Sequence, residues 1–392
     1  AQARKLYNAR FSVIDMRLVL AFVSLLLSPP LLAQQAAPPV PPIAARAYLL
    51  FDFNSAQLLA SHNPHERVEP ASLTKLMTAY LTFGALRQKT IQPEQTVPVS
   101  ERAWRAEGSR MFIEPRKPVT VNELIRGMIV QSGNDACIAL AEAVAGSEEV
   151  FAQMMNREAQ RLGMKNTSFV NSTGLSHPQH YSTAYDLALL AASIIRDFPE
   201  FYPLYSTKEF RYNNISQSNR NRLLWTDPTV DGMKTGYTEN AGYCLITSAR
   251  RGERRLISVV LGAASEAMRA TESQKLLNFG FQFYDSVRLY EKNQPVATLR
   301  VWKGSGNTVK AGFTNDLYLS LPKGQADKLK ASVESLQPLL APISAGQRIG
   351  ALKITLDGKP FRELPVVALE SVPLAGILGR GWDSIRLLFK NL

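Results

Sequence analysis

The chain has 392 residues, of which 45% are hydrophobic, so it is long enough for two domains and apolar enough for packed cores. This composition excludes a largely disordered protein. The formal net charge of +12 suits an anionic membrane surface or polymer. The basic residues are spread out without a dense basic run, so we expect no nucleic-acid partner.

The first predicted element is an export signal. A basic flank at Arg17 precedes an apolar run over 18–27, and Ala33 supplies the small residue after which we expect cleavage. The run is too short for a comfortable transmembrane helix. We therefore predict a signal peptide with its upstream segment over 1–33, then a proline-rich linker over 34–43.

The next region, 44–284, reads as an α/β (α+β) domain in which helices flank an antiparallel sheet. The predicted elements are strands over 45–53 and 57–61, a helix from Ser72 to about Leu86, a helical stretch over 122–144 interrupted by Ser132-Gly133-Asn134, a helix over 185–195, strands over 230–236, 241–249 and 256–263, and a helix over 272–279. The last three strands have short polar links, which predicts a β-meander.

The pattern changes after this domain. Short alternating strands with Gly and Pro turns fill 285–372, and Asp357-Gly358 marks a hairpin. We predict a small all-β domain that carries no catalytic residues and acts as a spacer.

The last twenty residues, 373–392, predict an amphipathic helix. Its apolar face consists of Leu374, Ile377, Leu378, Trp382, Ile385, Phe389 and Leu392, and its basic face of Arg380, Arg386 and Lys390. A basic helix with an aromatic-rich apolar face suits an anionic membrane surface, although it could also pack on the β-domain.

Cysteine and histidine are too sparse for a metal centre. Cys137 and Cys244 lie in apolar surroundings, so we prefer buried free thiols to a single disulfide. The four histidines form two separated pairs without a third ligand, so the prediction is no metal and no cofactor.

Three short motifs occur in a fixed order: Ser72-Leu73-Thr74-Lys75, Ser132-Gly133-Asn134 and Lys234-Thr235-Gly236. Together they resemble the motif set of class A β-lactamases and penicillin-binding proteins, which has Ser-Asp-Asn in the middle. The set implies a serine acyl-transfer site.

The chemistry of the first two motifs follows from their residue types. A serine hydroxyl at a helix start, Ser72, is a weak nucleophile until a base takes its proton, and Lys75 lies three residues on along the same face. Lys75 can be that base only if burial or neighbouring cations such as Lys234 lower its pKa. Ser132 offers a hydroxyl for a proton relay, and Asn134 an amide for the substrate backbone and Lys75.

The third motif suits a substrate with a free carboxylate. Lys234 on a strand edge can bind that group, and Thr235 adds a hydroxyl. Gly236 would let the substrate lie close to the strand. The backbone N–H of Tyr237, with that of Ser72, would form an oxyanion hole.

The resemblance extends beyond the motifs. Segments 110–115, 131–137, 219–225 and 231–236, together with the β-domain and the terminal helix, are similar to the D-alanyl-D-alanine carboxypeptidases of the low-molecular-mass penicillin-binding protein family. This resemblance implies a β-lactamase/transpeptidase-like fold. It also assigns Arg220 and Arg269 to the site, with Arg269 helping Lys234 to hold the terminal carboxylate.

The implied reaction removes the terminal D-alanine from peptidoglycan pentapeptide stems through a Ser72 acyl-enzyme, with β-lactams as inhibitors. The implied location is the periplasmic face of the inner membrane, with peripheral attachment through 373–392. Three features depart from the family: Tyr237 replaces a histidine, Arg222 replaces a small residue in some relatives, and Arg220 is one residue closer to Lys234.

Three alternatives remain at this stage. A class A β-lactamase would need a glutamate on the loop after the second motif, and residues 171–174 contain no acid. A DD-endopeptidase uses similar motifs and stays open. A membrane-docked scaffold that binds peptidoglycan stems with weak activity is the non-enzymatic alternative.

Overall fold

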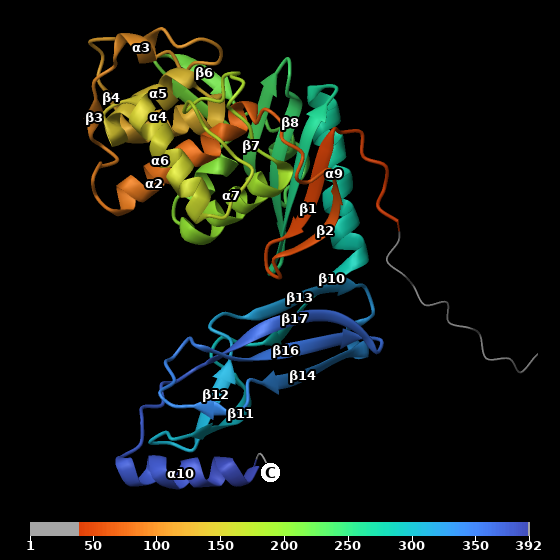
Figure 1. Cartoon of the computed structure of the whole chain (residues 1–392). Helices are drawn as coiled ribbons and strands as arrows, with labels where there is room; N and C mark the ends of the chain where they lie inside the picture. Colours follow the sequence, from red (N-terminus) through yellow and green to blue (C-terminus); the bar gives the residue numbers. More distant parts are fainter. Residues whose placement is uncertain (1–38, 391–392) are drawn as a thin grey trace, which may run out of the picture. The chain divides into compact units, whose positions relative to one another are not determined.

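The computed structural model describes residues 39–390, and Figure 1 shows the arrangement of their helices and strands. The predicted signal peptide and the first half of the predicted linker lie outside the described residues, as does Leu392 of the predicted apolar helix face.

A five-stranded antiparallel sheet forms the centre of the first region, with the strand order β2-β1-β9-β8-β7. Its strands are β1 (Ala47–Asp52), β2 (Gln57–His62), β7 (Val230–Thr238), β8 (Gly242–Arg251) and β9 (Arg254–Ala263). The predicted β-meander is confirmed, because β7, β8 and β9 pair consecutively. Among the described strands β7 pairs with β8 alone, so β7 is an edge strand of this sheet.

Consecutive apolar residues in the strands explain why both faces of this sheet are covered. Successive side chains of a strand point to opposite faces, so Leu49 of β1 joins the core under the helices, while Leu50 joins the core under α9 (Glu266–Phe283). Val259 and Val260 of β9 divide in the same way.

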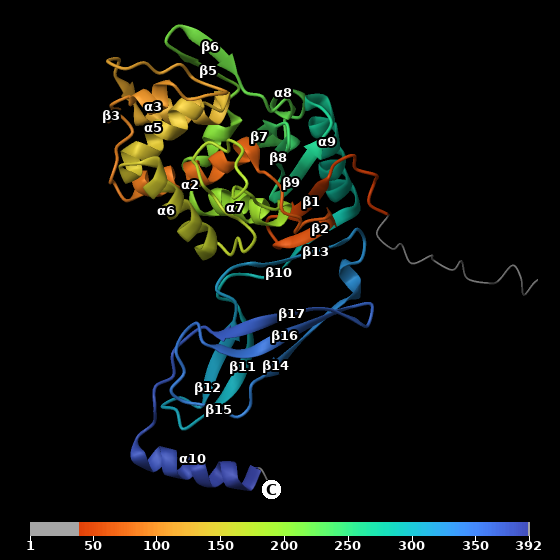
Figure 2. The same ribbon diagram turned by 45° about the horizontal axis from the view of Figure 1, so that its top comes forward.

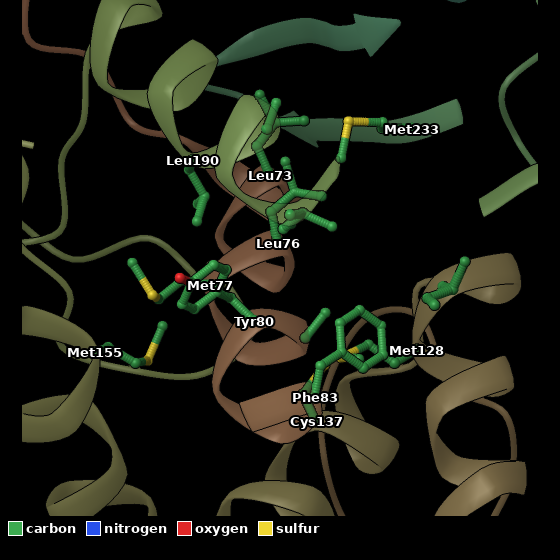
Figure 3. Packing of buried hydrophobic residues seen from close by; sticks show 14 of the residues in the cluster. Leu73, Leu76, Met77, Tyr80, Phe83, Met128, Cys137, Met155, Leu190 and Met233 are labelled. Carbon is green, nitrogen blue, oxygen red and sulfur yellow. The ribbon is translucent and has the colours of Figure 1, made fainter. Parts of the chain in front are cut away.

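The helices on the first face surround one buried helix, α2 (Lys75–Arg87). The others are α3 (Glu101–Trp104), α4 (Val121–Arg126), α5 (Asn134–Ala145), α6 (Glu148–Arg161) and α7 (Ala184–Asp197). The short α8 (Leu223–Thr226) instead packs into the core under α9, on the other face. Figure 3 shows Leu76, Met77 and Phe83 of α2 packed among side chains from its neighbours. A helix that is apolar almost all round is buried, which makes α2 a rigid base for Ser72 just before it.

The start of this helix differs slightly from the prediction. Residues Ala71–Thr74 form a 3-10 turn, and the α-helix proper begins at Lys75. Ser72 therefore lies in the 3-10 turn, before the α-helical hydrogen bonds of α2 begin.

A hairpin that the sequence analysis missed, β5 (Glu209–Tyr212) with β6 (Ile215–Ser218), projects from the helical part (Figure 2). Its turn residues Asn213 and Asn214 have φ values of 48° and 60°, the left-handed conformation that asparagine tolerates in type I′ turns. A second pair, β3 (Thr96–Val97) and β4 (Val119–Thr120), frames the segment that carries α3.

The second region is all-β with its own core, as predicted. Strands β10 (Tyr284–Tyr290) and β13 (Leu317–Pro322) pair, and a six-stranded sheet has the order β14-β16-β17-β12-β11-β15. Its strands are β11 (Pro295–Trp302), β12 (Thr308–Gly312), β14 (Leu329–Ser335), β15 (Leu339–Leu340), β16 (Arg348–Leu356) and β17 (Lys359–Ala368). The predicted Asp357-Gly358 turn joins β16 to β17, and both residues have positive φ. The terminal helix α10 spans Ile377–Lys390.

Candidate active site

A cavity of about 530 Å³ opens beside β7 and brings most of the predicted site residues together. Its lining includes Ser72, Ser132, Asn134, Arg220, Thr235, Gly236, Tyr237 and Arg269. Lys75 and Lys234 are not among the lining residues but are buried next to Ser72 and Thr235, which are, with relative exposures of 1% and 3%. All ten predicted residues thus lie in or directly under one cavity, although they come from segments up to 197 residues apart (72 to 269).

Lys75 is the hub of the site. Its Nζ lies 3.0 Å from Ser72 Oγ, 2.7 Å from Asn134 Oδ1 and 2.6 Å from the backbone oxygen of Thr173. The number of these partners equals the number of positions around the amine nitrogen that are not bonded to carbon. The amine is therefore held in direct contact with the hydroxyl that it would activate.

Burial lowers the pKa of Lys75 to about 8, and the charge of Arg220 adds to the effect. Burial also holds the pKa of Lys234 well below its ordinary value, and there the charge of Lys75 contributes. The lowered pKa makes the neutral form of Lys75 accessible around pH 8, where an exposed lysine would remain almost fully cationic.

Ser132 lies where the helical stretch over 122–144 is interrupted. A π-helical turn over Gly127–Gln131 ends at Ser132, which takes a left-handed φ of 68°, and α5 begins at Asn134. Within residues 39–390 the buried Ser132 Oγ has no hydrogen-bond partner. A buried hydroxyl that lines a cavity without a partner is available to a substrate.

Asn134 connects the amine of Lys75 to the cavity rim. Its Oδ1 accepts from Lys75, so its Nδ2 must be the donor, and that group donates to the backbone oxygen of Glu107 at 2.6 Å. The amide orientation is therefore set by two fixed partners.

The third motif lies on β7, as predicted, and the structure adds a second reason for Gly236. A Cβ at this position would lie 3.2 Å from Ala71 Cβ and 3.3 Å from Ser72 N. A side chain here would be crowded by the turn that carries Ser72, so this packing favours glycine in addition to the close approach of substrate that we expected.

The two arginines assigned by resemblance both reach the cavity. Arg269, on α9, is 3% exposed, and its Nη1 donates to the backbone oxygen of Gly236 at 3.3 Å. Arg220 is exposed at the rim and lines the cavity in spite of its shorter spacing to Lys234. Its neighbour Asn221 fixes this segment to β7 by donating to the backbone oxygen of Gly232 at 3.1 Å.

Tyr237 presents its side chain at the open end of the cavity. The ring is 50% exposed, and its centroid lies 4.4 Å from that of Tyr243 on the paired strand β8. Arg269 lies over the other aromatic member of this pair, Tyr243, at 5.7 Å. The tyrosine pair therefore forms an aromatic wall next to the cationic end.

Two site features escaped the sequence analysis. The backbone oxygen of Thr173 binds Lys75, and a backbone acceptor leaves no signal in residue type. The carboxylate of Asp135, directly after the second motif, accepts hydrogen bonds from the backbone N–H groups of Met111, Phe112 and Ile113. A buried acid next to a motif was visible in the sequence, but its partners, 22 to 24 residues upstream, were not.

The cysteines and other potential metal ligands of residues 39–390 form no metal-binding group. Cys137 and Cys244 are buried free thiols, as preferred from the sequence. In the part of the chain that the structure describes, no group of His, Cys, Asp and Glu side chains could hold a metal ion.

Comparison with known families and structures agrees with this geometry. The family described as D-alanyl-D-alanine carboxypeptidase matches residues 33–265, and the family described as penicillin-binding protein 5, C-terminal domain, matches residues 284–374. The chain is 43% identical over 372 residues to the D-alanyl-D-alanine carboxypeptidase DacC of Escherichia coli, covering 93% of both chains.

Solved structures show the same fold. Penicillin-binding protein 5 of Haemophilus influenzae superposes with a TM-score of 0.82 at 42% identity, covering 86% of this chain and 99% of that one. Penicillin-binding protein D2 of Listeria monocytogenes, in an ampicillin-bound form, has a TM-score of 0.58 at 31% identity and covers 62% of this chain and 100% of that one. The predicted transpeptidase-like fold is confirmed.

Proposed function

Because the chain belongs to the D-alanyl-D-alanine carboxypeptidase family, a group of serine hydrolases of the penicillin-binding class, we propose that it removes the terminal D-alanine from peptidoglycan pentapeptide stems with Ser72 as the nucleophile. The catalytic domain would be residues 44–284, and 285–372 would form the β-rich spacer.

One observation supports the proposed mechanism: two of the three hydrogen-bond partners of Lys75 Nζ are oxygens that can only accept. Asn134 Oδ1 and the Thr173 backbone oxygen each take one N–H of a neutral amine, which has two. Its lone pair then points to the third partner, the hydroxyl of Ser72, at 3.0 Å. The neutral amine is thus oriented as a general base rather than as a donor toward Ser72.

The reaction follows from this orientation. Lys75 takes the Ser72 proton as Oγ attacks the D-Ala–D-Ala carbonyl, and the backbone N–H groups of Ser72 and Tyr237 stabilise the oxyanion. The proton passes through the Ser132 hydroxyl to the leaving nitrogen as the C–N bond breaks, which releases D-alanine. Water then attacks the ester, and Ser72 recovers its proton.

The cationic end of the cavity supports a substrate that ends in a free carboxylate. Lys234, Arg220 and Arg269 converge there with the Thr235 hydroxyl. A substrate carboxylate would favour the charged form of Lys234, whose pKa is lowered by burial. A β-lactam carries an equivalent carboxylate next to its strained amide, so we expect it to acylate Ser72.

We further propose that the exported protein attaches to an anionic membrane surface through 373–392, on the periplasmic side of the inner membrane. Leu378 and Trp382 of α10 are 91% and 58% exposed, so the apolar face does not pack on the β-domain. No helix within residues 39–390 is long and apolar enough to cross a membrane.

Intact-mass spectrometry with penicillin, together with D-alanine release from a pentapeptide, tests the enzymatic proposal. We expect a long-lived adduct on the wild type, none on Ser72→Ala, and D-alanine from the wild type alone. A fleeting adduct with rapid penicillin hydrolysis and no D-alanine would favour a β-lactamase. Cleavage of crosslinked peptide dimers, without release of D-alanine from the pentapeptide, would favour an endopeptidase. Absence of any adduct would contradict the serine mechanism.

A further inference from the structure

We infer that His180 is a positioning residue for the acylation of Ser72 and that it acts through Thr74. The bond between the side chains of His180 and Thr74 holds the turn that carries the nucleophile against the loop whose carbonyl group binds Lys75. This inference rests on the proposed function, since the step that it concerns is the attack of Ser72 on a carbonyl group. It adds a residue that neither the three motifs nor the family resemblance assigns to the site.

The loop that binds Lys75 is closed at its base by backbone hydrogen bonds. Ser168 and Tyr181 exchange two such bonds, of 2.9 and 3.0 Å, and we call residues 168–181 the lysine-binding loop. Within this loop, the backbone oxygen of Thr173 accepts from Lys75 Nζ at 2.6 Å. The loop thus supplies one of the three partners that orient the amine, so a shift of the loop would turn the amine away from the nucleophile.

His180 is buried at the base of the lysine-binding loop, and both of its ring nitrogens have a partner. Its Nδ1 accepts from the backbone N–H of Val170 at 3.1 Å, so the proton of the neutral ring is on Nε2. Nε2–H then donates to Thr74 Oγ1 at 2.8 Å. Burial lowers the pKa of His180 to about 4, which keeps the ring neutral, as this arrangement requires. Because both nitrogens are engaged, His180 acts through Thr74 and not at the reacting atoms.

Thr74 belongs to the first motif, but the proposed mechanism does not use its hydroxyl. The residue is the N-cap of α2, a position where a threonine hydroxyl commonly accepts from a backbone N–H of its own helix, and here it makes no such bond. The fully buried hydroxyl binds His180 instead. The residue directly before Lys75 is thus joined to the lysine-binding loop, and this contact explains why the motif carries a hydroxyl here.

Other contacts hold the lysine-binding loop independently of His180. Thr78 Oγ1, on α2, donates to the backbone oxygen of Ser172 at 2.7 Å. From α6, the Glu148 carboxylate accepts from the backbone N–H and the hydroxyl of Ser172 at 2.9 and 2.6 Å. These contacts should keep the loop folded when the bond between His180 and Thr74 is removed. We therefore expect the loss of that bond to displace the loop locally, with more effect on the reaction rate than on stability.

Stopped-flow acylation by penicillin tests this inference above about pH 9, where the rate should no longer depend on the protonation of Lys75. The dissociation constant of the noncovalent complex and the rate constant of acylation are measured separately, with thermal midpoints as a check of folding. The amide of Asn can take the place of Nδ1 and that of Gln the place of Nε2, so only Gln keeps a donor to Thr74. The matched control is His177→Gln, on the same loop but exposed. The other variants are His180→Asn, His180→Gln, Thr74→Val, Thr74→Ser and the double variant His180→Asn/Thr74→Val.

We expect His180→Asn and Thr74→Val each to lower the rate constant of acylation about tenfold and to change the dissociation constant less than about twofold. The reason is that the amine and the hydroxyl become misaligned, while the cationic end of the cavity stays intact. The double variant should be no slower than either single variant, since both substitutions remove the same bond. His180→Gln should keep at least about half of the wild-type rate constant, and His177→Gln should match the wild type.

Lower thermal midpoints with unchanged rate constants would overturn the inference, because they would assign His180 a purely structural role. Losses that multiply in the double variant would also overturn it, since the two side chains would then act independently. If His180→Asn does not fold, Thr74→Val is compared with Thr74→Ser, which keeps the hydroxyl, and equal rate constants would contradict the inference. If penicillin does not acylate even the wild type, the proposed function itself fails, whereas the other outcomes leave it intact.

Discussion

The pKa of Lys75 decides how the acylation rate should depend on pH. Burial lowers this pKa to about 8, so the amine is mostly cationic at pH 6 and becomes a base as the pH rises. The rate of penicillin acylation should therefore increase about tenfold per pH unit between 6 and 7 and level off above about 9. Stopped-flow measurements on the wild type and on Lys165→Gln, an exposed lysine outside the cavity, should give the same profile. A rate independent of pH over this range would exclude Lys75 as the titrating base.

Gly236 offers a second test on the scale of one residue. An added methyl group would meet Ala71 Cβ and the backbone of Ser72 at 3.2–3.3 Å, so Gly236→Ala should shift the nucleophile away from Lys75. We expect acylation to slow roughly 10- to 100-fold and the free energy of unfolding to fall by about 1–3 kcal/mol. The control is Gly306→Ala, whose Cβ has no neighbour closer than 3.8 Å. If Gly236→Ala is acylated at the wild-type rate, the position of Ser72 does not depend on its close packing against residue 236.

Among the elements, α10 leads to a prediction about attachment. Its exposed Trp382 should enter the headgroup region of anionic vesicles, while the basic residues of the helix attract the surface. Trp382→Ala should weaken co-sedimentation with such vesicles about tenfold, and added salt should weaken it further. Trp225, 45% exposed in the catalytic domain, gives the matched control Trp225→Ala. Equal binding by the two variants would show that α10 is not the anchor.

The whole molecule contains separate hydrophobic cores, and this should be visible in its unfolding. The clusters on the two faces of the five-stranded sheet share strands, whereas the cluster of the β-rich region has Val309, Leu352 and Val366 at its centre. We expect calorimetry of the full chain to resolve two transitions, and acylation by penicillin to raise the midpoint of only one. A single transition that shifts as a whole would indicate one cooperative unit.

The sequence determined those features that depend on local pattern and on residue chemistry. The pattern of apolar residues predicted β7, β8 and β9, and Asp357-Gly358 predicted the turn between β16 and β17. The three motifs predicted that Ser72, Lys75 and Lys234 belong to one site. These signals are short-range, because side-chain period and turn conformation are properties of a few neighbouring residues. The β5–β6 hairpin also had a short-range signal, the Asn213-Asn214 pair, but the sequence analysis did not interpret this pair as a turn.

Only the tertiary structure decided what each of these residues touches. The Thr173 carbonyl on Lys75, the Asp135 carboxylate under the rim and the packing of Ser72 against Gly236 join segments from 22 to 164 residues apart (72 to 236). No residue type marks a backbone acceptor or a close approach in advance, because both exist only once distant segments pack.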